Sequence, residues 1–174
     1  MTAAGPVAAS ARLRLERVGV DRARRVVAGD LSVVDAAPGW PHDDTFDALR
    51  PDAEHARSDA ETGFLVTLVE TGQVVGDAGW KGGPDAAGRV EIGYGLAQPY
   101  RGRGLGTELV GLLTSWVAAQ PGVREVVAEV LVGNEPSLRA LLGNGYAVDR
   151  VEPPYTYLVR RVGSQPPPAV VTGE

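Results

Sequence analysis

Residues 101–106 read Arg-Gly-Arg-Gly-Leu-Gly, between a strand-like run at 89–96 and an amphipathic stretch at 104–119. Closely spaced glycines let the backbone turn tightly and point several N–H groups at one position. The start of a helix adds unsatisfied N–H groups and the positive end of the helix dipole, which favour an anion. The two arginines add local positive charge in a chain of net charge −5. This segment therefore predicts a phosphate or pyrophosphate site.

Three phosphate-binding motifs can be compared with this segment. The P-loop requires a lysine after its last glycine, and none is present here. The dinucleotide fingerprint requires Gly-x-Gly-x-x-Gly, which differs from the spacing of Gly102, Gly104 and Gly106. The pattern that fits is Arg-x-x-Gly-x-Gly, beginning at Arg101. An ordinary glycine-rich turn before a helix remains an alternative at this point.

A second informative segment lies downstream. The run at 126–132 predicts a buried strand, followed by Asn-Glu-Pro-Ser at 134–137 and Gly-Asn-Gly-Tyr at 143–146. Asn134 is a good helix N-cap, and Pro136 is tolerated in the first helical turn. The two glycines suit the end of that helix.

These segments together resemble the acyl-CoA-binding region of the GNAT superfamily of N-acetyltransferases. The runs at 76–80 and 90–96 are similar to the two strands before the loop in the branch that includes the ribosomal-protein N-terminal acetyltransferases. The resemblance covers residues 11–161 and is strongest over 91–146. It implies acetyl-CoA as co-substrate, bound by Leu96, Ala97, Arg101, Gly102, Arg103, Gly104, Leu105, Gly106, Thr107 and Asn134. The alternative is plain strand packing for Leu96 and Ala97, and a purely capping role for Asn134.

The same resemblance suggests a general base and a general acid. Glu91 is the candidate base, because apolar neighbours would partly desolvate its carboxylate. The alternative is a solvent-facing or arginine-paired glutamate. Many family members carry a tyrosine acid seven residues after the asparagine, but Leu141 stands there. Ser137 is therefore the candidate acid, unless its hydroxyl only caps the helix.

We expect the acceptor pocket in the segment after the first helix. Trp40, His42, Asp44 and Phe46 combine aromatic faces with acidic groups, which suit a protonated amine. The alternative is that the two aromatic residues belong to the core and the acids cap a helix. Two further aromatics, Trp80 and Tyr94, are also expected in the core.

The composition excludes several other chemistries. The chain has no cysteine, two histidines and one lysine, so we expect no disulfide, no thiolate and no metal site. No basic patch with interleaved aromatic residues indicates nucleic-acid binding. No long apolar run indicates a membrane span, and no signal peptide is evident. We expect a cytoplasmic protein, and the composition hints at a bacterial source.

The 174 residues predict one α/β domain over 11–162, with a mobile segment at 1–10 and a disordered proline-rich tail at 163–174. Its sheet should be mixed and mostly antiparallel, with helices on both faces and two strands splayed at the acyl-CoA site. Asp21 should cap the first helix, and Thr71-Gly72 should form a two-residue hairpin turn. Strands are expected at 12–18, 63–70, 73–81, 89–96, 124–132, 146–151 and 155–162, and helices at 21–31, 44–61, 104–119 and 134–142. The range 44–61 is either one helix or two short ones broken near Pro51.

The leading interpretation is an N-acetyltransferase that moves an acetyl group from acetyl-CoA to a primary amine by direct attack in a ternary complex. The amine would belong to a protein N-terminus or to a small molecule. A non-catalytic acyl-CoA-binding domain is the alternative, since the usual tyrosine acid is missing, and a purely structural α/β domain is a third. The oligomeric state is left open between a monomer and a homodimer.

Overall fold

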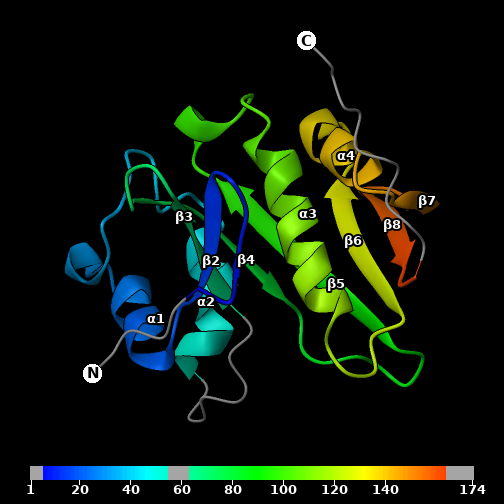
Figure 1. The fold of residues 1–174 in the computed structure, drawn as a ribbon, viewed down its shortest axis with the longest axis horizontal. Coiled ribbons are helices and arrows are strands. Elements are labelled where there is room, and N and C mark those ends of the chain that lie inside the picture. Colours follow the sequence, from blue (N-terminus) through cyan, green and yellow to red (C-terminus); the bar gives the residue numbers. More distant parts are fainter. Residues whose placement is uncertain (1–5, 55–62, 164–174) are drawn as a thin grey trace.

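The computed structural model describes residues 6–54 and 63–163. Its centre is an eight-stranded sheet in the order β1-β2-β3-β4-β5-β6-β8-β7 (Figure 1). Neighbouring strands pair antiparallel, except that β5 and β6 pair parallel. The strands are β1 (Ala8–Ala9), β2 (Leu13–Arg17), β3 (Gly63–Leu68), β4 (Val74–Trp80), β5 (Arg89–Leu96), β6 (Glu125–Leu131), β7 (Ala147–Glu152) and β8 (Tyr155–Arg161).

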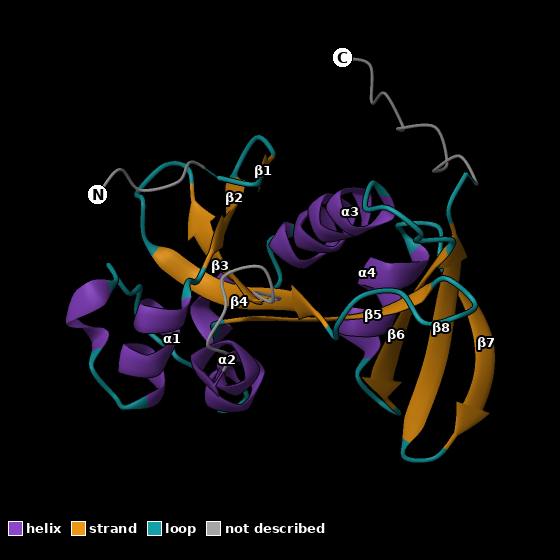
Figure 2. Ribbon diagram, turned by 90° about the horizontal axis from the view of Figure 1, so that it is seen from below, coloured by secondary structure: helices purple, strands orange, loops and turns teal. Residues whose placement is uncertain are grey.

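Four α-helices in the described residues cover the sheet from both sides. Figure 2 shows α1 (Val20–Val27) and α2 (Thr45–Glu54) on one face, and α3 (Leu105–Ala118) and α4 (Glu135–Leu142) on the other. Short 3-10 helices occupy Leu31–Val33 and Gln98–Tyr100. The predicted mixed, mostly antiparallel α/β fold with helices on both faces is confirmed.

The period-2 pattern of β5 divides its side chains between the two faces. Val90, Ile92 and Leu96 are buried in the core cluster that also holds the apolar side of α3. Glu91, Gly93 and Gly95 therefore lie on the opposite face, which is the face of α1 and α2. The strand thus separates the side of α3 and α4 from the side that we call the acceptor face.

The strands β5 and β6 are neighbours over three residue pairs and then diverge. Their register begins at Arg89 opposite Glu125 and ends at Glu91 opposite Val127. Beyond that point β5 continues to pair with β4 as far as Leu96, and β6 continues with β8 as far as Leu131. The predicted splay is therefore present, and it opens directly after Glu91.

The N-terminal segment departs from the sequence prediction. Residues 1–10 were expected to be mobile, but Ala8–Ala9 form β1 and pair with Arg14 and Leu15. Ser10 also contacts Glu108 of α3 through a 2.7 Å hydrogen bond. Two alanines carry too little pattern to predict a strand, so this pairing depends on β2 being present. The tail at 164–174 lies outside the described residues.

Two local predictions were also wrong. Gly19, with φ +73°, occupies the N-cap of α1 instead of Asp21, which lies in the first turn. The β3–β4 hairpin closes on Leu68 and Gln73, so its loop is longer than the predicted Thr71-Gly72. The reason is that Val69 donates its N–H to Arg12 of the neighbouring segment and leaves the hairpin ladder.

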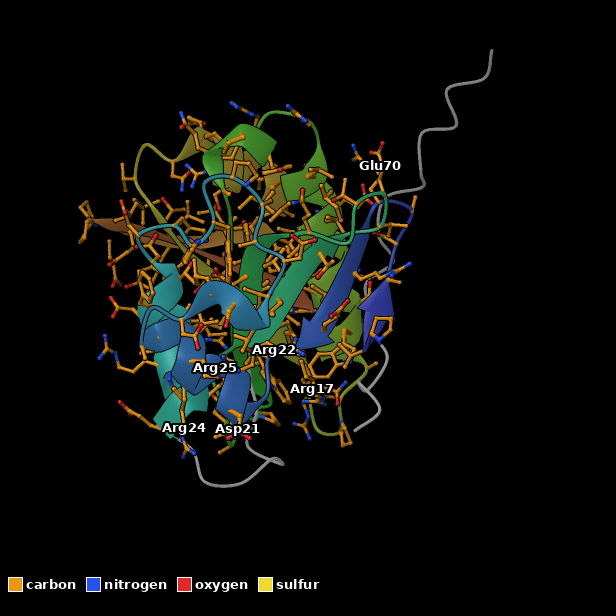
Figure 3. All side chains as sticks on the ribbon, turned by 90° about the vertical axis from the view of Figure 1, so that its left-hand side faces the viewer. Arg17, Asp21, Arg22, Arg24, Arg25 and Glu70 are labelled. Carbon is orange, nitrogen blue, oxygen red and sulfur yellow. The ribbon has the colours of Figure 1, made fainter. Side chains whose placement is uncertain are left out.

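The helix predicted at 44–61 is present as α2 and continues through Pro51 to Glu54; His55 and the rest of that range lie outside the described residues. Arg24 of α1 donates to the carbonyl of Ala53 at 2.8 Å and so joins the two helices. Figure 3 shows Arg22, Arg24 and Arg25 projecting from α1. None of the helices in the described ranges is both long and apolar enough to cross a bilayer.

Candidate active site

The N-terminus of α3 carries no side-chain cap. Its N-cap residue is Gly104 in the left-handed conformation, with φ +75°, and no side chain hydrogen-bonds to the first turn. The N–H groups of Leu105, Gly106 and Thr107 belong to that first turn, where no intrahelical acceptor is available. Gly102 is also left-handed, with φ +73°, and an added Cβ there would meet open space. These uncapped N–H groups are the ones that the sequence predicts to bind an anion.

Arg101 attaches this loop to the end of β5. Its Nε donates to the carbonyl of Leu96 at 2.8 Å. Arg103 lies with its guanidinium 5.9 Å from the ring centroid of Tyr100. Arg101 thus has a positioning contact in addition to its charge, and both arginines stand at the loop that precedes α3.

Polar contacts from the segment between β1 and β2 also hold the start of α3, and the sequence analysis missed them. Glu108 accepts hydrogen bonds from Arg12 Nε at 2.6 Å and from Ser10 Oγ at 2.7 Å. Arg12 Nη1 also donates to the carbonyl of Arg103 at 2.9 Å. The guanidinium offsets the charge of a carboxylate that would otherwise oppose an anion. No local sequence signal could identify Arg12, because its partner lies 96 residues away.

The edge of β5 that faces the gap is defined by its ladder with β4. The backbone carbonyl of Glu91 accepts the N–H of Lys81, and Ala97 donates its N–H to the carbonyl of Val75, both at 2.8 Å. Alternate residues of a strand direct their backbone groups to opposite sides. Tyr94 and Leu96 therefore direct theirs toward the gap between β5 and β6. Ala97 does not, since its N–H donates to the carbonyl of Val75 in β4. That N–H is therefore not free for the predicted contact with pantetheine.

The hydroxyl groups of Tyr94 and Ser137 meet across the gap. Tyr94 projects from β5, Ser137 lies in the first turn of α4, and the two oxygens are 2.7 Å apart. Partial burial raises the pKa of Tyr94, and the hydrogen bond with Ser137 opposes that rise only in part. Tyr94 was expected in the core, and its ring does pack there, but its hydroxyl reaches the site.

Asn134 caps α4, as predicted. Its Oδ1 accepts the backbone N–H of Ser137 at 3.3 Å. The Ser137 hydroxyl is therefore not the capping group, which removes the structural alternative for this side chain. Leu141 is fully buried in the core, so the position where relatives carry a tyrosine has no chemical role here.

Glu91 lies at the closed end of the gap and forms an ion pair with Lys81. Its side chain is 25% exposed, so the carboxylate is partly accessible. The sequence left open that Glu91 pairs with an arginine. The observed arrangement is similar, but the partner is Lys81, the single lysine of the chain.

On the acceptor face, His42 and Trp40 gather around a buried carboxylate. Asp77 of β4 is 2% exposed, and its Oδ2 accepts hydrogen bonds from Trp40 Nε1 at 2.9 Å and Thr45 Oγ1 at 2.6 Å. His42 Nε2 lies 3.2 Å from the same oxygen but is not aligned for a hydrogen bond with it. Trp40 is buried, so it supports this cluster instead of lining a pocket, as the core alternative proposed.

Asp77 was missed as a site residue, although a signal existed. It is the one acidic residue within the apolar run Val74–Trp80, where a charge is costly unless it has partners. Of the other predicted acceptor residues, Asp44 is exposed and Phe46 is half-buried on α2. Among the described residues, no three histidine or acidic side chains cluster closely enough to bind a metal ion.

Comparison with known proteins places this arrangement in a family. The chain matches the model of the acetyltransferase (GNAT) domain over residues 12–147. It is 24% identical over 124 residues to the uncharacterized N-acetyltransferase YjdG of Bacillus subtilis, covering 69% of this chain and 74% of that protein.

Two solved structures share the fold. The microcin C7 self-immunity acetyltransferase MccE, in complex with acetyl-CoA and AMP, is 13% identical with a TM-score of 0.63, covering 88% of this chain and 94% of that one. The ribosomal L7/L12 alpha-N-protein acetyltransferase RimL is 15% identical with a TM-score of 0.63, covering 91% and 94%.

The chain belongs to the GNAT family of acetyltransferases. This membership makes it an N-acetyltransferase, and the GNAT acetyltransferases use acetyl-CoA.

Proposed function

We propose that this enzyme transfers an acetyl group from acetyl-CoA directly to a primary amine, at a protein N-terminus or on a small molecule. The observation that carries the proposal is the position of the β5–β6 gap. It opens after Glu91, beside the uncapped start of α3, and Tyr94 and Ser137 meet across it. The groups proposed to bind an anion and to donate a proton are thus adjacent to one opening in the sheet.

The loop before α3 would hold the pyrophosphate of acetyl-CoA. The backbone N–H groups of residues 102–107 are the donors, and Arg101 and Arg103 add positive charge. The gap-facing backbone groups of Tyr94 and Leu96 would pair with the amides of the extended pantetheine arm, as an added strand does at a sheet edge. A bound acetyl group would then lie next to the hydroxyl of Ser137.

Ser137 is proposed to protonate the departing thiolate. Its hydroxyl contacts Tyr94 at 2.7 Å and leaves the capping of α4 to Asn134. Tyr94 would orient this hydroxyl and supply the phenol that other relatives place seven residues after the asparagine. General-acid help of this kind is typically worth about 10²–10⁴-fold in rate.

The acceptor would approach from the opposite face. Glu91 and Asp44 are accessible carboxylates near this entry, and negative charge attracts a protonated amine. Glu91 is the base that the sequence predicts, acting directly or through water. Its carboxylate is already paired with Lys81 at the closed end of the gap, so an acceptor ammonium would compete with that lysine. The name of RimL, an alpha-N-protein acetyltransferase, supports an N-terminal amine as one acceptor.

The experiment is a turnover assay with acetyl-CoA against small primary amines and short peptides with free or blocked N-termini. Mass spectrometry of the products identifies the acetylated nitrogen. Acetylation of a free α-amine, and none when it is blocked, supports the proposal. Acetyl transfer to hydroxyl groups alone, or none to any amine, would contradict it. A cytoplasmic location and the oligomeric state stay predictions of the sequence.

A further inference from the structure

The Cε1–Nε2 edge of the His42 imidazole lies close to Gly95, near the C-terminal end of β5. A Cβ added to Gly95 would stand 2.6 Å from both Cε1 and Nε2 of His42. Such a distance is impossible for real atoms, so any side chain at this position would displace the ring. Gly95 therefore creates the space that His42 occupies, and the backbone of β5 fixes where the ring lies.

Gly95 belongs to the part of β5 that borders the gap. Gly95 stands between Tyr94 and Leu96, whose backbone groups point toward the gap. Glu91 lies four residues earlier, about 13 Å away along an extended strand. His42 is thus placed beside the segment that would hold the acetyl end of the co-substrate, whereas Glu91 is at the closed end of the gap.

The carboxylate of Asp77 lies next to one nitrogen of the ring. Its Oδ2 is 3.2 Å from His42 Nε2, and Trp40 and Thr45 hold the carboxylate in place with two hydrogen bonds. Thr45 Oγ1 also accepts the backbone N–H of His42 at 3.1 Å, which links the histidine to the same cluster. A carboxylate beside one ring nitrogen keeps the proton there, so the other nitrogen, Nδ1, becomes the acceptor.

Two acidic groups and one basic group act on the charge of the His42 ring. Asp77 faces it from β4, Asp44 from its own segment and Arg101 from the loop before α3. The contact with Asp77 raises the pKa of His42, burial opposes the rise, Asp44 adds to it and Arg101 subtracts. A histidine with a raised pKa is a stronger base for the removal of a proton from an ammonium group.

We propose that His42, oriented by Asp77, is the general base that deprotonates the acceptor amine. The inference rests on the proposed function. One proton passes from the ammonium group to Nδ1 of His42 and later to solvent. The amine nitrogen then bonds to the thioester carbonyl carbon, the carbon–sulfur bond breaks, and the thiolate takes a proton from Ser137. The second amine proton restores the Ser137 hydroxyl, so the atoms and charges balance.

The test is the pH dependence of kcat/KM for the amine in the full-length enzyme. The wild type should lose activity at acidic pH as His42 becomes protonated. His42→Gln should lower kcat/KM by about 10²–10⁴-fold and abolish this acidic limb. Asp77→Asn should shift the limb to lower pH, because the ring loses the charge that favours its protonated form. Added imidazole should restore part of the rate of His42→Ala.

Two controls separate the competing explanations. Glu91→Gln should keep the acidic limb, and so should His55→Gln, which removes the other histidine. Calorimetry with CoA should show that His42→Gln still binds the co-substrate. An acidic limb that persists in His42→Gln, or disappears in Glu91→Gln, overturns the role of His42 while the acetyl transfer itself stands. A wild type inactive on every amine overturns the proposed function, and the role of His42 with it.

Discussion

The hydroxyl of Ser137 lies 2.7 Å from the hydroxyl of Tyr94, although the two residues are 43 positions apart in the chain. The contact joins α4 to β5 across the place where β5 has separated from β6. Because Asn134 caps the helix through the Ser137 backbone, the serine hydroxyl serves no capping purpose. The hydroxyl of Ser137 is therefore available as a candidate proton donor.

Ser137→Ala should slow the chemical step about ten- to a hundredfold with little loss of CoA affinity, since the leaving thiolate has a pKa of about 8.5 and needs only modest help. Tyr94→Phe should produce a smaller loss in the same step. If the two act as a unit, the double variant should be no slower than Ser137→Ala. Single-turnover rates measure this, and unchanged rates in Ser137→Ala would make water the proton donor.

Asn134→Ala provides the matched stability control. It removes the cap of α4 and should cost about 1 kcal/mol in the free energy of unfolding, whereas Ser137→Ala should cost less. Thermal or denaturant unfolding of both variants tests this division. A larger loss in Ser137→Ala than in Asn134→Ala would return the serine to a structural role.

Acetyl-CoA or CoA should raise the melting temperature. A ligand that binds only the native state stabilises it by RT ln(1 + [L]/Kd), roughly 2.7 kcal/mol at a hundredfold excess over Kd. Differential scanning fluorimetry detects the shift. No shift at millimolar CoA, with no heat of binding by calorimetry, would contradict the assignment of the loop before α3.

Gly104→Val should weaken CoA binding strongly while the fold is kept. The native φ of +75° is unfavourable for a β-branched residue, and the added side chain obstructs approach to the N–H groups of α3. Gly72→Val is the matched control, because Gly72 has the same φ of +75° but lies in the β3–β4 loop. Calorimetry should show loss of affinity in the first variant alone; equal affinities would make the loop an ordinary turn.

The stability of the protein should depend on pH through His42. Its folded-state pKa is raised, chiefly by Asp77, so folding is favoured when the ring is protonated. This contribution is fully present below the unfolded pKa of about 6.5 and is lost as pH rises through the folded value. His42→Gln should reduce the fall in unfolding free energy between pH 6 and pH 8, as measured by urea denaturation. An identical fall in both proteins would mean that Asp77 does not stabilise the charged ring.

The sequence by itself determined the features that depend on neighbouring residues. The left-handed Gly104 before α3, the Asn134 cap of α4 and the strand at 89–96 follow from glycine conformation, capping chemistry and period-2 alternation. These rules act over a few residues, so one chain is enough to apply them. The same local pattern was sufficient to predict the family and the acetyl-CoA loop.

Only the tertiary structure decided which side chains meet. Tyr94 reaches Ser137, Arg12 reaches Glu108 over 96 positions, and His42 rests on Gly95 beside Asp77. Each contact depends on how strands and helices pack, and packing is set by the whole core instead of by adjacent residues. Ala97 illustrates the converse, because its neighbours suggest a site residue while the β4–β5 register turns its N–H into the sheet. The proposed acyl-CoA loop therefore depends on adjacent residues, and the proposed proton-transfer groups are brought together by the fold.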